Sequence, residues 1–92
     1  MIYKPPFKEV HISGNLYLRE FKSDTDEEQL IWHLDREDRV ISVVKGSNWK
    51  LQLDNQLPMK LTEGREYFIP KLTYHRLIKG NDKLIIITHF QP

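Results

Sequence analysis

Residues 64–75 read Gly64-Arg65-Glu66-Tyr67-Phe68-Ile69-Pro70-Lys71-Leu72-Thr73-Tyr74-His75, and this stretch says most about the fold. Tyr67 to Ile69 are aromatic and β-branched residues, which favour the pleated surface of a sheet. Pro70 then suits a strand edge, where no backbone N–H is needed for the ladder. A new strand opens at Tyr74 and carries His75 near its start. The stretch therefore predicts two short strands, with an imidazole where the second one begins.

The rest of the chain also has the composition of a β protein. Alanine is absent, whereas isoleucine, valine, threonine and aromatic residues are plentiful. Residues 49–54 alternate strictly between apolar and polar side chains, and glycine, asparagine and aspartate mark turns between such runs. We predict short strands at 7–12, 15–22, 29–35, 39–45, 48–54, 57–62, 66–69, 74–79 and 83–90. This spacing indicates an all-β fold, a sandwich or barrel of antiparallel strands.

Size and charge exclude several classes of protein. A chain of 92 residues has room for one domain, residues 1–92, and its 14 basic and 13 acidic residues give a net charge of only +1. Cysteine is absent, which excludes disulfides and thiol catalysis. The longest wholly apolar run, Leu84 to Ile87, is far below the roughly 18 residues that span a bilayer. Met1 to Pro6 lack the apolar segment of a secretory signal. We therefore expect a cytoplasmic protein with no nucleic-acid or membrane partner.

A second informative segment is residues 33–39. If residues 29–35 form a strand, His33 and Asp35 lie on one face, because alternate side chains share a side, while Trp32 and Leu34 point the other way. Residues 36–38 form a tight polar turn, and the returning strand brings Arg39 back near Asp35. We therefore expect His33 and Asp35, which are of types that bind metals, to lie close to the permanently charged Arg39.

These two segments resemble the two motifs of the cupin family. In that family the first motif reads glycine, a spacer, His-x-His, three or four residues, glutamate, six residues and glycine. The second reads glycine, five residues, Pro-x-Gly, two residues, histidine, three residues and asparagine. On this chain the first motif falls on His33, Asp35, Arg39 and Gly46, and the second on Gly64, Pro70, Leu72, His75 and Lys79. These spacings fit the motifs, and the resemblance covers roughly residues 25–90.

Several identities depart from the family pattern. Asp35 stands at the second histidine, Arg39 at the glutamate, Leu72 at the second glycine and Lys79 at the asparagine. Glu27 or Glu28 stands where the leading glycine of the first motif is usual. The resemblance implies a small single-domain cupin-like barrel of the jelly-roll type, built from two antiparallel sheets.

The resemblance also implies a metal site. Carried over residue by residue, the family's ligands for a divalent metal (Fe, Mn, Ni or Zn) leave His33, Asp35 and His75 on this chain. Arg39 replaces the glutamate, and a unit charge about 4 Å away costs on the order of 4 kcal/mol per metal charge at an effective dielectric near 20. Asp35 and Arg39 can instead pair with each other without a metal. Metal binding is therefore expected to be weakened.

Without a metal, the same residues form a pocket for a small anion. Arg39 offers a planar fork to a phosphate or carboxylate, and His33 and His75 donate hydrogen bonds. Trp49 and Phe68 either stack on a ring of the ligand or pack in the core. The preferred hypothesis is a binding protein that captures a small polar, anionic metabolite: a phosphosugar, nucleotide or carboxylate. The alternative is a metal-dependent enzyme of the dioxygenase or isomerase type that uses His33, Asp35 and His75.

A homodimer is expected, because a small barrel has sheet edges to cover. We expect residues 7–12 and 83–90 to pair or swap between subunits. Trp32 and Tyr74, on the faces opposite the histidines, are candidates for a contact between sheets or subunits.

Overall fold

The computed structural model describes residues 5–92 and confirms the all-β prediction. Its strands are β1 (Lys8–Ser13), β2 (Leu16–Phe21), β3 (Arg39–Lys45), β4 (Lys50–Leu53), β5 (Met59–Lys60), β6 (Glu66–Ile69), β7 (His75–Ile78) and β8 (Leu84–Phe90). A 3-10 helix, Glu27–Gln29, lies between β2 and β3. Residues 1–4, part of the stretch on which the expectation of no secretory signal rests, lie outside the described part. Within residues 5–92, no helix is long and apolar enough to cross a membrane.

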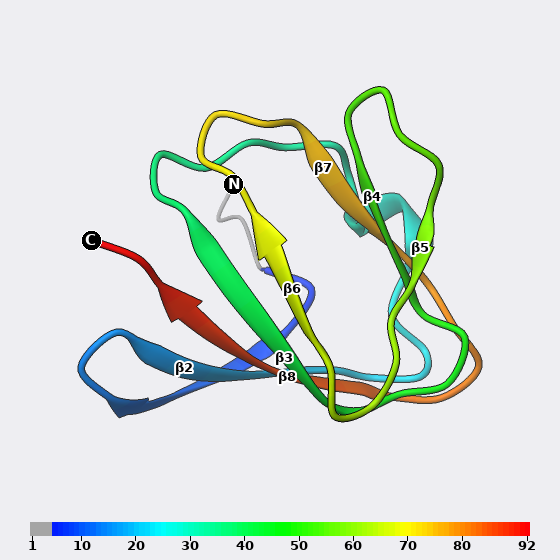
Figure 1. The fold of residues 1–92 in the computed structure, drawn as a ribbon. Coiled ribbons are helices and arrows are strands. Elements are labelled where there is room, and N and C mark those ends of the chain that lie inside the picture. Colours follow the sequence, from blue (N-terminus) through cyan, green and yellow to red (C-terminus); the bar gives the residue numbers. More distant parts are fainter. Residues whose placement is uncertain (1–4) are drawn as a thin grey trace, which may run out of the picture.

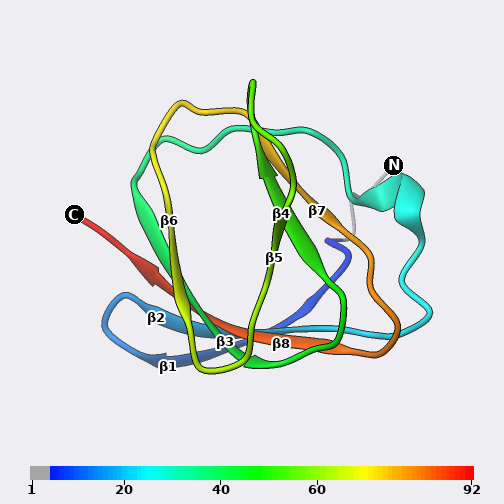
Figure 2. The same ribbon diagram turned by 45° about the vertical axis from the view of Figure 1, so that its right-hand side comes forward.

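The strands form two antiparallel sheets that face each other (Figure 1). The larger sheet has the order β1-β2-β8-β3-β6, and the smaller one has the order β5-β4-β7. Figure 2 shows the smaller sheet across the interior from the larger one. The two-sheet architecture predicted from the motifs is therefore confirmed.

The hydrophobic core fills the space between the sheets. Along β8, Leu84, Ile86 and Thr88 are buried, whereas the residues between them are partly exposed, as expected when alternate side chains point to opposite faces. Trp49 is fully buried, and its indole N–H donates to the Asp82 carbonyl over 2.8 Å. The buried apolar residues are Phe21, Ile41, Val43, Trp49, Leu51, Leu53, Leu61, Ile69, Leu84 and Ile86.

The predicted strand at 29–35 is wrong. The side chain of Asp26 accepts a hydrogen bond from the Glu28 N–H over 2.9 Å, which caps the 3-10 helix and turns the chain at residues 27–29. The segment that follows is extended, but only His33 joins a ladder, through an isolated bridge to His75. Alternating side chains in this segment therefore indicate an extended chain that runs beside β7 rather than a strand.

The expectation that residues 83–90 pair or swap between subunits stays a prediction, and within the single chain this strand has partners on both sides. Strand β8 lies between β2 and β3 and pairs with both along its length, so it has no free edge. Its nearly continuous apolar run is typical of such a central strand. By contrast β1 is an edge strand, and all six of its residues are exposed.

Candidate functional site

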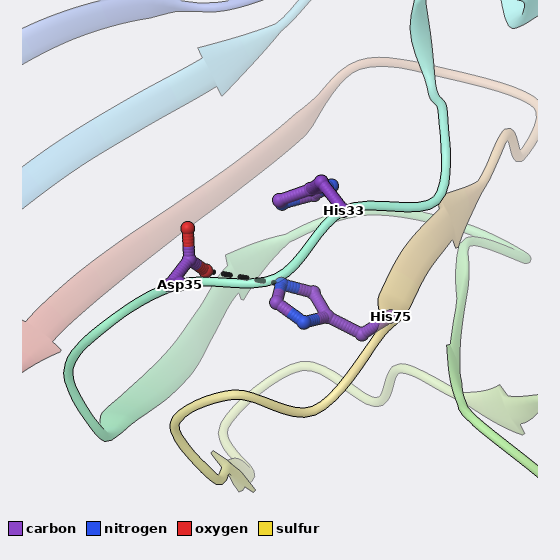
Figure 3. Close-up of side chains that lie close together, drawn as sticks. All are labelled: His33, Asp35 and His75. Carbon is purple, nitrogen blue, oxygen red and sulfur yellow. Dashed lines mark ion pairs between the residues drawn. The ribbon is translucent and has the colours of Figure 1, made fainter.

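His33, Asp35 and His75, which we call the His-Asp-His group, lie close together, with His75 buried, Asp35 half-buried and His33 exposed. One ligand atom from each residue lies within 4.8 Å of the others. The bridge between the extended segment and β7 brings the imidazoles together: the His33 N–H donates to the His75 carbonyl over 3.0 Å, and the His75 N–H donates to the His33 carbonyl over 2.9 Å. Asp35 follows two residues after His33 on the same segment (Figure 3).

Backbone carbonyls orient both imidazoles in the same way. Nδ1 of His33 lies 2.9 Å from the Ile31 carbonyl oxygen, and Nδ1 of His75 lies 2.9 Å from the Thr73 carbonyl oxygen. A carbonyl only accepts, so each Nδ1 carries the proton, an assignment made from the hydrogen bonds. The lone pair of each neutral ring is then on Nε2. Histidine ligands of metals are commonly fixed by a carbonyl on the other ring nitrogen in this manner.

The Asp35 carboxylate has one satisfied and one unsatisfied oxygen. Oδ1 lies 3.0 Å from Nη2 of Arg39. Oδ2 lies 3.3 Å from Nε2 of His75, an ion-pair distance without hydrogen-bond geometry, and it is buried with no hydrogen-bond partner in the described part of the chain. Burial raises the pKa of Asp35, but the interaction with His75 and the charge of Arg39 outweigh it, so the pKa lies below its ordinary value. Asp35 is therefore ionised at neutral pH.

The donor set fits a divalent metal. Two neutral imidazole nitrogens and one carboxylate oxygen form a two-histidine, one-carboxylate set, which leaves further coordination positions open. Metal ligands of these types lie about 2.0–2.2 Å from the ion, so two of them on one ion stand about 3 Å apart. The 3.3 Å separation of Asp35 Oδ2 and His75 Nε2 is close to that spacing. The unpartnered Oδ2 is the atom that a metal would satisfy.

Arg39 returns to the site from the start of β3, as the sequence predicts. Its Nη2 contacts Asp35 and also lies 2.8 Å from Oε1 of Glu37, so two carboxylates share one guanidinium. The guanidinium carbon lies 4.5 Å from the centroid of the Phe90 ring. Its Nε is buried and makes no hydrogen bond with any residue from 5 to 92. Arg39 thus has a buried donor, Nε, that no residue from 5 to 92 satisfies.

A cavity of about 330 Å³ opens beside the His-Asp-His group. Such a volume is at the lower end of the range in which small-molecule sites lie. Most of its wall is apolar, and its polar lining residues include the His-Asp-His group. The lining residues are Pro5, Pro6, Phe7, Arg19, Phe21, Gln29, Leu30, Ile31, His33, Asp35, Arg39, Ile41, Leu51, Ile69, His75, Leu77, Ile86 and Thr88.

Three polar residues that line the cavity, Arg19, Gln29 and Thr88, escape our sequence analysis. Thr88 is 1% exposed, and its hydroxyl has no hydrogen-bond partner among the described residues. Arg19, on β2, lines the same cavity. The available signal for Thr88 was a lone hydroxyl at an inward position of an apolar strand. Arg19 stands between Leu18 and Glu20 in a strand of mixed character, which gave no comparable signal.

Trp49 and Phe68, the aromatic residues expected at the ligand, do not line this cavity. Trp49 packs in the core, with its ring centroid 5.8 Å from that of Phe21. This is the core-packing alternative that the sequence left open. Phe68 is 53% exposed on the edge strand β6, where neighbouring Ile69 takes the inward position. Neither ring can stack on a molecule inside this cavity.

Comparisons with known proteins match the fold rather than the sequence. No family model matches the chain, and no curated protein does. Among solved structures, an RmlC-like cupin family protein with a double-stranded β-helix fold from Methanocaldococcus jannaschii is similar with a TM-score of 0.74 and 17% identity, over 97% of this chain and 83% of that one.

Two similar structures are considerably longer than this chain. A DMSP lyase structure is similar with a TM-score of 0.72 and 19% identity over 84% of this chain, which spans only 37% of that one. The structure of FeII HppE gives a TM-score of 0.64 and 14% identity over 83% of this chain, which spans 41% of that one. Together with the sheets and the His-Asp-His group, these likenesses show that the chain has the cupin fold.

Proposed function

We propose that this chain is a metal-dependent cupin enzyme whose divalent metal is held by His33, Asp35 and His75. The observation that carries the proposal is the convergence of one ligand atom from each residue within 4.8 Å of the others. Backbone carbonyls fix both imidazoles through Nδ1, and Asp35 Oδ2 has no partner among residues 5–92. Three protein ligands with open positions beside a cavity are typical of a catalytic rather than a structural metal site. The likeness to FeII HppE supports a metal in this place.

Arg39 does not oppose the metal as strongly as its position in the motif suggests. Its guanidinium contacts both Asp35 and Glu37, so its positive charge is already balanced by two carboxylates. The expected penalty, on the order of 4 kcal/mol per metal charge, applies to an isolated cation. With the pair of acidic partners, the surroundings of the group carry net negative charge, which favours a divalent cation.

The cavity suits the chemistry that a bound metal supplies, which is to polarise an oxygen of a small substrate as a Lewis acid. The wall of the cavity is mostly apolar, and Arg39 orients Asp35 through the 3.0 Å contact. The substrate we propose is a small polar molecule with an anionic group. The DMSP lyases, which share the fold, support an enzyme rather than a protein that only binds.

Metal content of protein purified without chelator tests this proposal. We expect about one divalent ion per chain by elemental analysis. In His33→Ala and in His75→Ala we expect metal affinity to fall at least tenfold, because even residues that only hydrogen-bond to a metal ligand contribute about 10-fold to 100-fold to metal affinity. His89→Ala is the matched control, because His89 is exposed on β8 outside the group. The proposal is wrong if the protein holds much less than one metal ion per chain after dialysis against Fe²⁺, Mn²⁺, Ni²⁺ and Zn²⁺, and if neither substitution changes this metal content.

A metal-free binding protein is the second candidate function. The contact between Asp35 and Arg39 favours it, because this pair balances both charges without an ion. In this case the cavity captures a small anionic metabolite through Arg39, His33 and His75. A stoichiometric metal in the experiment above speaks against this candidate, and ligand stabilisation of metal-free protein speaks for it.

We also propose that two copies of the chain form a homodimer through the outer face of the larger sheet. Cross-strand register places Val10, Leu18 and Ile87 in one apolar row on this face, and Val40 and Phe68 in another. An exposed sheet face is ordinarily polar, so apolar rows indicate a covered surface. In an isologous dimer the same patch of both copies is in contact, so the patch should carry no net charge. At the margin of this patch Lys8 and Glu20 are cross-strand neighbours of opposite charge.

Light scattering coupled to size exclusion tests the dimer. We expect a mass of twice the 11.1 kDa chain for the unmodified protein and a monomer for Val10→Glu combined with Phe68→Glu, because two buried carboxylates would stand in the apolar patch. Both residues are about half exposed, at 52% and 53%, so the fold should persist. Leu57→Glu, at an 85% exposed position between β4 and β5, is the control and should leave the mass unchanged. A monomeric unmodified protein contradicts the proposal.

A further inference from the structure

Three buried polar side-chain atoms have no hydrogen-bond partner among residues 5–92: Asp35 Oδ2, Arg39 Nε and Thr88 Oγ1. All three residues line the same cavity. Buried polar groups without partners are rare and costly, and each commonly marks a bound molecule or ion. The metal proposal above uses only Asp35 Oδ2. Arg39 Nε and Thr88 Oγ1 are therefore available to a second partner in the cavity.

The two remaining atoms come from neighbouring positions on the inner face of the larger sheet. In the β3–β8 register Arg39 is opposite Phe90, and Ile41 is opposite Thr88. Arg39 and Thr88 are thus diagonal neighbours, whose backbone positions stand about 7–8 Å apart. The guanidinium N–H and the hydroxyl are both donors. A ligand group with two acceptor oxygens can bridge a gap of this kind.

The net charge around the cavity indicates which kind of ligand group fits there. Of the described residues that line the cavity, Arg19 and Arg39 are the two cations with permanent charge. Arg19 Nε lies 2.6 Å from Glu9 Oε2, and Arg39 contacts Asp35 and Glu37, so the carboxylates exceed the guanidinium groups by one. A divalent ion on the His-Asp-His group turns that excess into one positive charge. A ligand group with a single negative charge balances it, whereas a phosphate dianion does not.

The apolar residues of the cavity wall indicate what the rest of the ligand is made of. Phe7, Phe21, Leu51, Leu77 and Ile86 are apolar residues that line the cavity. A sugar places hydroxyls along its whole body and would leave them without partners against these side chains, which costs free energy for each hydroxyl. An apolar body loses no hydrogen bonds there. The wall therefore fits a hydrocarbon body attached to the anionic group.

We propose that the substrate is a small monocarboxylate with an apolar body, and that Arg39 Nε and Thr88 Oγ1 hold its carboxylate. The proposal rests on the metal-dependent function proposed above, since the metal supplies the charge that the carboxylate balances. It narrows the anionic class by excluding phosphosugars and nucleotides. Thr88 acts in it as a residue that determines specificity.

Calorimetry with three matched probes tests the ligand class. Hexanoate, hexanamide and hexyl phosphate share an apolar body of similar length and differ in the charge of the head group. With the metal-loaded protein we expect hexanoate to bind at least about tenfold tighter than either other probe, because hydrogen bonds to charged groups contribute that much. Equal or tighter binding of hexyl phosphate or hexanamide overturns the proposal, as does an absence of hexanoate binding.

Thr88→Val tests the residue, because valine keeps the shape and removes only the hydroxyl. We expect hexanoate affinity to fall about tenfold while the melting temperature does not fall, since the hydroxyl has no partner in the chain to lose. Ser42→Ala is the control, because Ser42 lies on the same sheet and faces away from the cavity between buried Ile41 and Val43. Unchanged affinity in Thr88→Val overturns the role of Thr88.

Metal content measured on the same samples separates this inference from the proposed function. Stoichiometric metal without preference for hexanoate means that the metal site stands and the substrate class is wrong. Absent metal with hexanoate binding that depends on Thr88 means that the metal function is wrong and the carboxylate subsite stands.

Discussion

Asp35→Ala is expected to lower the free energy of unfolding of metal-free protein by about 3 kcal/mol, because it leaves the buried guanidinium of Arg39 with one partner fewer. The side chains of Arg39 and Asp35 are only 13% and 16% exposed, so water replaces the lost carboxylate poorly. The estimate is at the lower end of the 3–5 kcal/mol seen for broken buried pairs, because Glu37 keeps its contact with Arg39. Urea unfolding in the presence of chelator measures this change.

The same carboxylate gives a dependence on pH whose direction is fixed by its pKa. Since the pKa of Asp35 is lowered in the folded protein from its ordinary value of 3.8, the unfolded chain takes up the proton first as pH falls. The stabilisation is fully present above about pH 4 and is lost as pH falls through the folded-state pKa. The difference in unfolding free energy between the unmodified protein and Asp35→Asn should thus be largest near neutral pH and shrink in acid.

An exposed aspartate provides the control for both measurements. Asp24→Asn, in the loop after β2, should change the unfolding free energy by less than about 0.5 kcal/mol at neutral pH, as is usual for surface positions. A stability difference for Asp35→Asn that grows as pH falls would contradict the ion pair with Arg39. A difference no larger than that of Asp24→Asn would show that Asp35 does not stabilise the fold.

Local sequence was sufficient to predict that certain polar side chains lie close together wherever chemistry and spacing were read together. His33, Asp35 and Arg39 lie within seven residues around a polar turn, so their convergence follows from short-range geometry. His75 was harder, since only its place in the second motif linked it to the first. The structure supplies the physical link, a pair of backbone hydrogen bonds between His33 and His75.

Long-range register explains what the sequence could not supply. Thr88 reaches the cavity because β8 is central and pairs with β3, so Ile41 and Thr88 stand opposite each other. Nothing near Thr88 in the sequence indicates this partner. The error at 29–35 has a different origin, because an alternating pattern is found in any extended segment and not only in a strand. In addition, the side chain of Asp26 caps the 3-10 helix at residues 27–29, so the chain turns just before this segment. Trp49 shows a third limit, because only its burial in the folded protein distinguishes a core residue from a ring that stacks on a ligand.

Gly80→Ala is expected to lower the free energy of unfolding by more than about 3 kcal/mol, the upper range for overpacked sites. A Cβ at Gly80 would overlap the Ser47 carbonyl oxygen and would lie 2.6 Å from the Trp49 backbone nitrogen and 2.5 Å from Trp49 Cδ1. Two of these atoms are backbone, and the Asn81 N–H holds the Ser47 carbonyl at 3.0 Å, so relief requires the loops to separate. Denaturant unfolding measures the loss.

Gly14→Ala separates steric overlap from backbone strain at a glycine. Gly14 has a φ of 50°, in the left-handed region, and its added Cβ would meet no atom within 4 Å. Its substitution should therefore cost only the 1–2 kcal/mol typical of a left-handed residue with a Cβ. If Gly80→Ala costs no more than Gly14→Ala, the contact between the β3–β4 and β7–β8 connections is looser than the structure shows. A larger loss establishes that Gly80 lets these connections close over Trp49, which packs β4 and hence β7 with His75 against the larger sheet.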